Sequence, residues 1–337
     1  MAYPAAVHPG AAPQPRAGHY MEIILHLGAH RSASTSFQHY LRKNGARLAA
    51  GGVGVWGPPQ TRNGLLEGVL PRPGLVSYAA QMQRARGRIA LALADIEMAG
   101  IERLIVTDEN MIGTPRSILR AQRLYPGAGE RMARYAAGFG GRITRVVLSV
   151  RAQDAWWASC IAYAVARGAR VPSRVRLTQI AADPRTWRDV ICDLACALPG
   201  VEIQVMPHEV FASRPEARLQ AMARLPTPPK TAAREWLNRA PELPALRQVI
   251  HDRGGDPALL PDGDGPWQPF TREERTALRE AYHDDLFWLR AGADGFATLT
   301  EEPDMDQVGP TLPIHAETRG RDHDQEGARR LAQAGRS

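Results

Sequence analysis

A short loop of small residues follows an apolar segment near the start of the chain. The segment, residues 23–27, ends at Gly28, and the loop after it carries one cation, Arg31, before the hydroxyl residues Ser34, Thr35 and Ser36. A strand, a tight turn and a helix beginning at Ser34 would direct unpaired backbone N–H groups and the positive end of the helix dipole at one point. This loop therefore predicts a site for phosphate or sulfate.

Two further segments place polar residues just after apolar strand patterns. Residues 145–150 lead into Arg151, and Ser159 follows eight residues later, in a helix that Asp154 is expected to cap. Residues 103–107 lead into Asp108 and Glu109. Taken alone, Arg151 is a cation at a strand end and Ser159 a serine inside a helix.

The first loop resembles the nucleotide-binding loop of the sulfotransferase family, which reads roughly G-A-[PH]-K-[ST]-G-T-T-S-x-Q. The sequence Gly28-Ala29-His30-Arg31-Ser32-Ala33-Ser34-Thr35-Ser36-Phe37-Gln38 follows it, with Arg31 for Lys, Ala33 for Gly and Ser34 for Thr. The family also binds a 3′-phosphate with an Arg at a strand end and a Ser eight positions later, the spacing of Arg151 and Ser159. Residues 270–289 resemble the C-terminal helix of bacterial carbohydrate-type members.

This resemblance implies transfer of a sulfuryl group from 3′-phosphoadenosine 5′-phosphosulfate (PAPS) to a hydroxyl of a carbohydrate or other small molecule, without a metal. Residues 28–36 would hold the 5′-phosphosulfate, and Arg31 would contact its oxygens during transfer. Arg151 and Ser159 would hold the 3′-phosphate. Glu109 would accept the proton of the acceptor, with Asp108 and His26 as alternatives. His30 is expected to shape the loop backbone.

Two other functions stay open. Gly28 also begins the frame G-x-x-x-x-G-K-[ST] of a small-molecule P-loop kinase, although Ser34 stands where that frame has its lysine. Arg31 can donate hydrogen bonds but does not give up its proton, and Ala33 disfavours a positive φ. The site can therefore be degenerate, in a non-catalytic protein that binds PAPS or its desulfated product, adenosine 3′,5′-bisphosphate (PAP).

Strands and helices are expected to alternate along the chain. Strands are predicted near 22–27, 103–107, 145–150 and 201–205, and helices near 76–99, 128–139, 154–167 and 184–198. The alternation predicts an α/β fold with a parallel central sheet, in which Gly28, Glu109 and Arg151 face one crevice. The family resemblance adds a three-layer arrangement with P-loop-NTPase-like topology and a helical C-terminal part. The three glycines Gly51, Gly52 and Gly54 indicate a helix end and a turn.

The length of 337 residues allows one large domain, predicted over residues 21–299. Residues 1–20 are predicted to be disordered and residues 300–337 to form a mobile charged tail. The absence of a signal-peptide pattern and of about 18 consecutive apolar residues predicts a cytoplasmic protein with no membrane span. A net charge of +7 favours anionic ligands, but the scattered cations show no nucleic-acid motif. The oligomeric state is not predicted.

Cysteine usage argues against a disulfide scaffold, because the chain has only three cysteines, Cys160, Cys192 and Cys196. Cys192 and Cys196 lie one helical turn apart without further ligands at a useful spacing. All three are expected to be buried thiols and not metal ligands.

Overall fold

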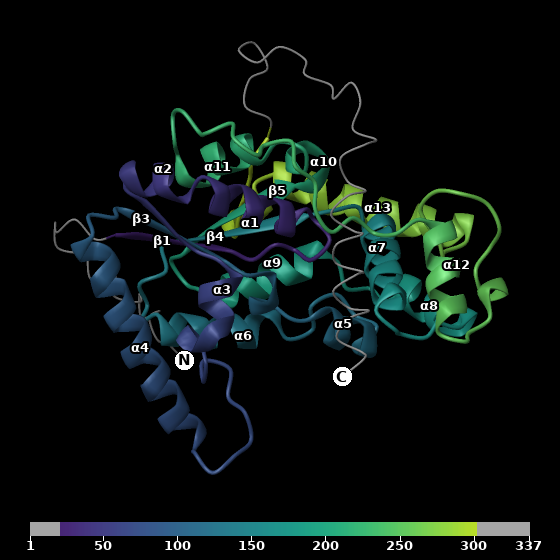
Figure 1. Ribbon diagram of the computed structural model, residues 1–337, viewed down its shortest axis with the longest axis horizontal. Coiled ribbons are helices and arrows are strands. Elements are labelled where there is room, and N and C mark those ends of the chain that lie inside the picture. The colour runs from purple at the N-terminus through teal and green to yellow at the C-terminus, as the bar shows by residue number, and fades with distance from the viewer. Residues whose placement is uncertain (1–20, 302–337) are drawn as a thin grey trace, which may run out of the picture.

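Six parallel strands form one sheet at the centre of the protein (Figure 1). The computed structural model describes residues 21–301, so residues 1–20 and nearly all of the predicted tail lie outside the described range. The strands are β1 (Glu22–His26), β2 (Val53–Trp56), β3 (Arg103–Thr107), β4 (Arg145–Val150), β5 (Glu202–Pro207) and β6 (Thr298–Leu299). Their order is β2-β3-β1-β4-β5-β6, which places β1 between β3 and β4. A crevice is expected where the chain leaves these three strands at their carboxyl ends.

Helices cover both faces of the sheet (Figure 1). One face carries α1 (Ser34–Lys43), α2 (Gly45–Ala50), α10 (His208–Phe211) and α11 (Pro215–Ala223). The other carries α4 (Tyr78–Met98), α6 (Ala128–Gly138) and α9 (Trp187–Ala197). Successive side chains of a strand point to opposite faces. Accordingly, Ile24 of β1 packs in the cluster that contains Phe37, whereas Ile23 and Leu25 pack in the cluster that contains Ile89.

The remaining helices gather around the carboxyl end of β4. There, α7 (Gln153–Ala166) contacts α12 (Leu243–Asp252) and α13 (Arg272–Arg290), and α13 also contacts α8 (Arg174–Ala182). Short helical segments connect these elements: α3 (Pro58–Gln60), η1 (Thr61–Leu65), η2 (Glu109–Met111), α5 (Pro115–Ala121), η3 (Pro257–Leu259) and η4 (Ala293–Gly295). No helix within residues 21–301 is long and apolar enough to cross a membrane.

The predicted α/β fold with a parallel sheet is confirmed, and the four predicted strands and four predicted helices are present. Two strands were not predicted. The turn at Gly51 and Gly52 is present, but it leads directly into β2, whose apolar pattern Gly54 interrupts. Strand β6 has only two residues, which are too few to form a recognisable strand pattern in the sequence.

The cysteine prediction is only partly right. Cys160 is buried, Cys192 is half-buried and Cys196 is exposed. Val190, Ile191 and Leu194 form the buried stripe of α9. Cys196 lies off this stripe, near the end of the helix, and therefore reaches solvent.

Candidate functional site

The loop between β1 and α1 packs directly against Glu109. Gly28 has a φ of 88°, and a Cβ atom at this position would lie 2.8 Å from the Cβ of Glu109. Only glycine tolerates both the left-handed backbone and this close approach. Gly28 therefore allows the loop after β1 and the residue after β3 to share one site.

Two residues with side chains also adopt the left-handed conformation in this loop. Arg31 has a φ of 58°, and Ala33, the residue before α1, has a φ of 63°. This conformation costs a residue with a Cβ roughly 1–2 kcal/mol. Ala33 thus adopts the positive φ that its side chain disfavours. Because it has no side-chain acceptor, the first N–H groups of α1 are left without a side-chain cap.

The loop hydroxyl groups all have protein partners. Ser32 and Ser34 both donate to the carbonyl oxygen of Ala29, at 2.6 and 2.7 Å, and so brace the loop from inside. Thr35 accepts a hydrogen bond from Asn238 at 3.4 Å. Ser36 accepts one from the backbone N–H of Leu237 at 2.9 Å. These last two contacts attach a distant segment to the start of α1.

Arg31, Arg151 and Ser159 come together although they are far apart in sequence. The Nε of Arg31 donates to the Oγ of Ser159 at 3.0 Å, across 128 positions of the chain. Arg151 donates through Nη1 to the carbonyl oxygen of Arg31 at 2.7 Å. Burial lowers the pKa of both guanidinium groups from the ordinary value, yet arginine stays protonated at neutral pH. Two fixed positive charges therefore lie beside a hydroxyl group.

The start of α7, which positions Ser159, is fixed by a residue other than the predicted one. Asp154 does not cap this helix: it is buried in the first turn and accepts a hydrogen bond from Arg279 at 2.7 Å. The N-cap is Ala152, whose N–H donates to Glu209 at 3.1 Å. Glu209 follows β5, so a carboxylate from the neighbouring strand end holds the N-cap residue, and the first turn of α7 has no side-chain cap.

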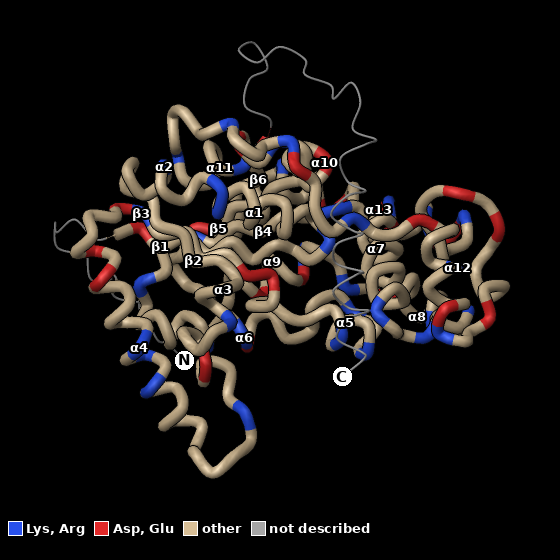
Figure 2. Tube along the Cα trace, in the orientation of Figure 1, with Lys and Arg blue, Asp and Glu red and all other residues tan. Residues whose placement is uncertain are grey.

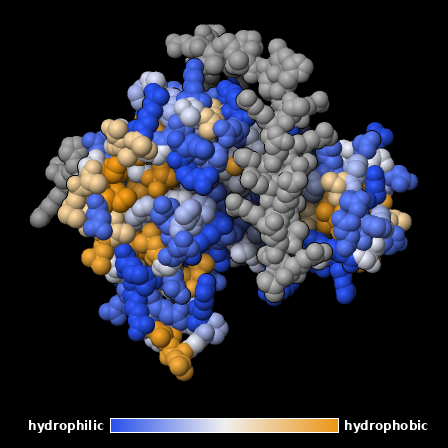
Figure 3. Space-filling model, viewed as in Figure 1, coloured by the Kyte–Doolittle hydropathy of each residue, from blue (hydrophilic) through white to orange (hydrophobic). Residues whose placement is uncertain are grey.

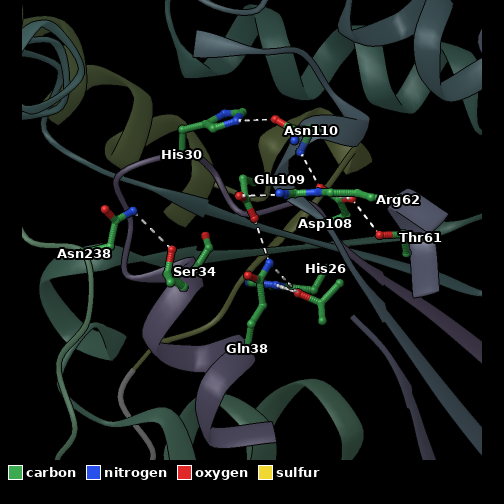
Figure 4. A network of polar contacts seen from close by, with 12 residues as sticks. His26, His30, Ser34, Gln38, Thr61, Arg62, Asp108, Glu109, Asn110 and Asn238 are labelled. Carbon is green, nitrogen blue, oxygen red and sulfur yellow. Dashed lines mark hydrogen bonds and ion pairs between the residues drawn. The ribbon is translucent and has the colours of Figure 1, made fainter. Parts of the chain in front are cut away.

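Glu109 is held by two donors at the carboxyl end of β3 (Figure 4). Gln38 donates to its Oε2 at 2.7 Å, and Arg62 donates to its Oε1 at 3.1 Å. Its side chain is 15% exposed, so the carboxylate is sheltered yet still reachable from solvent. These contacts orient one carboxylate beside the loop.

The two alternative bases are engaged elsewhere. Asp108 accepts two hydrogen bonds from Arg62 and one from Thr61. Burial raises its pKa, but these hydrogen bonds outweigh that effect and hold the pKa below its ordinary value. His26 is fully buried and bonds Thr107 through Nδ1 at 2.8 Å. Burial lowers the pKa of His26 well below 6.5, so this imidazole is neutral.

Hydrogen bonds hold both the ring and the backbone of His30 in the loop. Its Nε2 donates to Asn110 at 3.1 Å, so its Nδ1 accepts from the hydroxyl of Tyr125 at 2.8 Å. The same hydroxyl accepts from the backbone N–H of His30, and Trp156 donates to its carbonyl oxygen at 2.7 Å. Burial lowers the pKa of His30. Both nitrogens of this neutral ring are therefore engaged in hydrogen bonds within the protein.

A cavity of about 320 Å³ joins these groups. Eight of the predicted site residues line it: His30, Arg31, Ala33, Ser34, Thr35, Glu109, Arg151 and Ser159. The other four loop residues lie behind the cavity surface and contribute to the conformation of the loop: Gly28, Ala29, Ser32 and Ser36. Among the described residues of the lining, three are arginines and Glu109 is the one carboxylate, so the cavity favours an anion.

Much of the cavity wall was not predicted: Pro115, the α7 residues Ala155, Ala158, Ala162 and Tyr163, His208, and residues 236–241 and 266–268. His208 directly follows β5 and could have been found by the strand-end rule that selects Gly28, Glu109 and Arg151. Burial, reinforced by nearby arginines, lowers the pKa of His208 to about 3. Residues 236–241 have no periodic pattern that would place them over α1.

Within residues 21–301, no group of three or more His, Cys, Asp or Glu side chains is arranged to hold a metal ion. No protein-family model matches the chain, and no curated protein sequence matches it significantly.

Proposed function

We propose that this protein binds PAPS in the cavity and transfers its sulfuryl group to an acceptor hydroxyl. The observation that carries this proposal is the contact between the two anion-binding segments, the hydrogen bond from Arg31 to Ser159. A nucleotide with charged groups at both its 3′ and 5′ positions needs two such segments, and they must be close enough for one nucleotide to contact both. A nucleoside triphosphate carries its phosphates at one end only.

The roles divide between the two segments. The N–H groups at the start of α1 would hold the 5′-phosphosulfate, as helix N-termini commonly hold anions. Arg151 and Ser159 would hold the 3′-phosphate with charge-assisted hydrogen bonds. The loop lies between the central strand β1 and α1, a placement that suits the P-loop-NTPase-like topology of the proposed family.

Transfer would form a bond from the acceptor oxygen to sulfur and break the bond from sulfur to the bridging oxygen of PAPS. Glu109 would take the acceptor proton, and Gln38 and Arg62 would hold its carboxylate in position. Negative charge grows on the leaving oxygen, where Arg31 would stabilise it once it turns from Ser159. Positioning and fixed charge supply most of the rate in such in-line transfers.

A second cavity, of about 410 Å³, offers room for the acceptor. It runs along α1 and shares Thr35 and Leu237 with the first cavity. Gln38, which lines it, bonds Glu109. His39, Arg42 and Gln60 add polar groups to the lining, which suits a carbohydrate or another polar small molecule.

A non-catalytic binder is the alternative that one observation favours. Arg31 is bonded to Ser159, and the hydroxyl groups of Ser32 and Ser34 already donate to the carbonyl oxygen of Ala29. A site that keeps these contacts would hold PAP or PAPS without promoting transfer.

The test is incubation of the purified protein with PAPS and a panel of carbohydrates, with release of PAP as the readout. Sulfuryl transfer predicts PAP release that depends on an acceptor. Tight PAP binding with no release on any acceptor would assign the protein to the non-catalytic class. Absence of both binding and release would reject the proposal.

A further inference from the structure

One part of the molecule projects from the domain and takes no part in the site. Residues 68–94, here called the arm, comprise a loop and most of α4 (Figure 1). The face of α4 that packs on the domain carries Ala85, Ile89 and Leu93. Val69, at the base of the loop, is buried in the core, whereas the rest of the loop and the start of the helix project away from the sheet and its covering helices (Figure 1).

The tip of the arm exposes apolar side chains on a fixed backbone. Leu75 is 108% exposed and Tyr78 is 54% exposed. Gln81 bonds both the N–H and the carbonyl oxygen of Arg72, and also the carbonyl oxygen of Val76. Ser77 caps α4 by accepting a hydrogen bond from Ala80. This hydrogen-bonded loop therefore keeps the apolar side chain of Leu75 exposed to water. Transfer of that side chain to an apolar environment would be favourable.

The charge of the arm has one sign only. Residues 68–94 contain four arginines, at positions 72, 84, 86 and 88, and no Asp or Glu. Arg72, Arg84 and Arg86 are exposed, whereas Arg88 bonds the carbonyl oxygen of Gly64 in η1 and so anchors the arm to the domain. Figure 2 shows the cations of α4 on the projecting part of the chain, and Figure 3 shows an apolar tip below hydrophilic flanks.

We propose that the arm docks on an anionic lipid surface, with Leu75 and Tyr78 inserted at the level of the headgroups and the arginines beside them facing the lipid phosphates. Proteins that lie on a membrane without spanning it bind through apolar area inserted at the interface together with electrostatic attraction to anionic lipids. Each arginine near such a surface contributes to binding by attraction to acidic lipids. A soluble polyanion such as RNA would pair the arginines but leave Leu75 in water. This inference is independent of the chemistry in the cavity.

The test is sedimentation of the full-length protein with vesicles of phosphatidylcholine alone, or of phosphatidylcholine and phosphatidylglycerol in equal parts. The proposal predicts binding to the anionic vesicles that raised salt weakens and that neutral vesicles do not reproduce. Leu75→Asp should lower the partition coefficient about tenfold or more, because it places a charge where an apolar side chain inserts. The double change Arg84→Glu and Arg86→Glu should lower it by a similar factor.

Two matched controls separate the arm from general charge and hydrophobicity. Leu259→Asp changes another exposed leucine, 59% exposed on η3, and should leave vesicle binding unchanged. The double change Arg116→Glu and Arg120→Glu alters net charge by the same amount on α5 and should have a much smaller effect than the arm variant. Equal binding to neutral vesicles, equal losses in arm and control variants, or binding to RNA without binding to vesicles would each overturn the proposal.

Discussion

Replacing Arg151 with alanine tests the proposed 3′-phosphate site, because this arginine has two separable contacts. In the protein, its Nη1 donates to the carbonyl oxygen of Arg31 at 2.7 Å. With nucleotide bound, its guanidinium would also contact the 3′-phosphate. The first contact matters for any ligand of the loop, whereas the second matters only for a ligand that carries a 3′-phosphate.

The two contacts affect different sets of ligands. A hydrogen bond to a charged partner is worth about 1.5–3 kcal/mol, which corresponds to about 10- to 150-fold in affinity. The hydrogen bond from Arg151 to the backbone carbonyl of Arg31 orders the loop whichever nucleotide is bound, so its loss should weaken every nucleotide by a similar factor. Arg151→Ala should therefore weaken PAP binding about tenfold more than it weakens AMP binding.

Isothermal titration calorimetry of both ligands with parent and variant measures this difference. Arg224→Ala is the matched control, because Arg224 is exposed, pairs with Glu202 at 3.1 Å and does not line the cavity. It should leave both affinities unchanged. Equal losses of PAP and AMP affinity in Arg151→Ala would show that Arg151 only positions the loop, and the assignment of the 3′-phosphate site would be wrong.

Three further outcomes are expected. Glu109→Gln should keep PAP affinity and lower turnover by roughly 10²–10⁴, the usual contribution of a positioned base; unchanged turnover would exclude Glu109 as the base. Arg31→Lys introduces the lysine of the sulfotransferase loop pattern and should retain or raise turnover, and a fall in turnover with unchanged PAP affinity would contradict the role proposed for this position. Acidification from pH 7.5 to 5.5 should lower the free energy of unfolding, because His26 and His208 resist protonation in the fold but charge freely with a pKa near 6.5 once unfolded. The loss should be about 3 kcal/mol for the two. Burial raises the pKa of Asp285 to about 6, so this side chain takes up a proton in the folded state over the same pH interval. That uptake should raise the free energy of unfolding by about 1 kcal/mol and offset part of the loss. Chemical denaturation at the two pH values measures the net change, and a protein more stable at pH 5.5 would refute this balance.

Local patterns were sufficient to predict the strands that carry the site. The apolar runs before Gly28, Glu109 and Arg151 are continuous, since parallel strands are buried on both faces. Because such strands end at one edge of a sheet, the meeting of these three residues in one region followed from topology. The rotamer of Arg31, bonded to Ser159, could not be predicted, because it depends on a helix 128 positions away.

Other features depend on partners that no local pattern reveals. The prediction that Asp154 caps α7 is wrong: the N-cap is Ala152, and its partner Glu209 comes from α10, which follows the neighbouring strand β5. The hydrogen bonds that hold His30 involve Tyr125, Asn110 and Trp156, which come from three different parts of the chain. Residues 236–241 reach the site through hydrogen bonds to Thr35 and Ser36, and irregular segments of this kind carry no periodicity.

Calorimetric comparison of PAP with ATP tests the central claim most directly. If both segments bind anions as proposed, the parent protein should bind PAP at least about tenfold more tightly than ATP, since only PAP would reach both segments. The same proposal predicts that added Mg²⁺ does not strengthen PAP binding. ATP bound as tightly as PAP, in a manner that requires Mg²⁺, would contradict the claim and favour a small-molecule kinase.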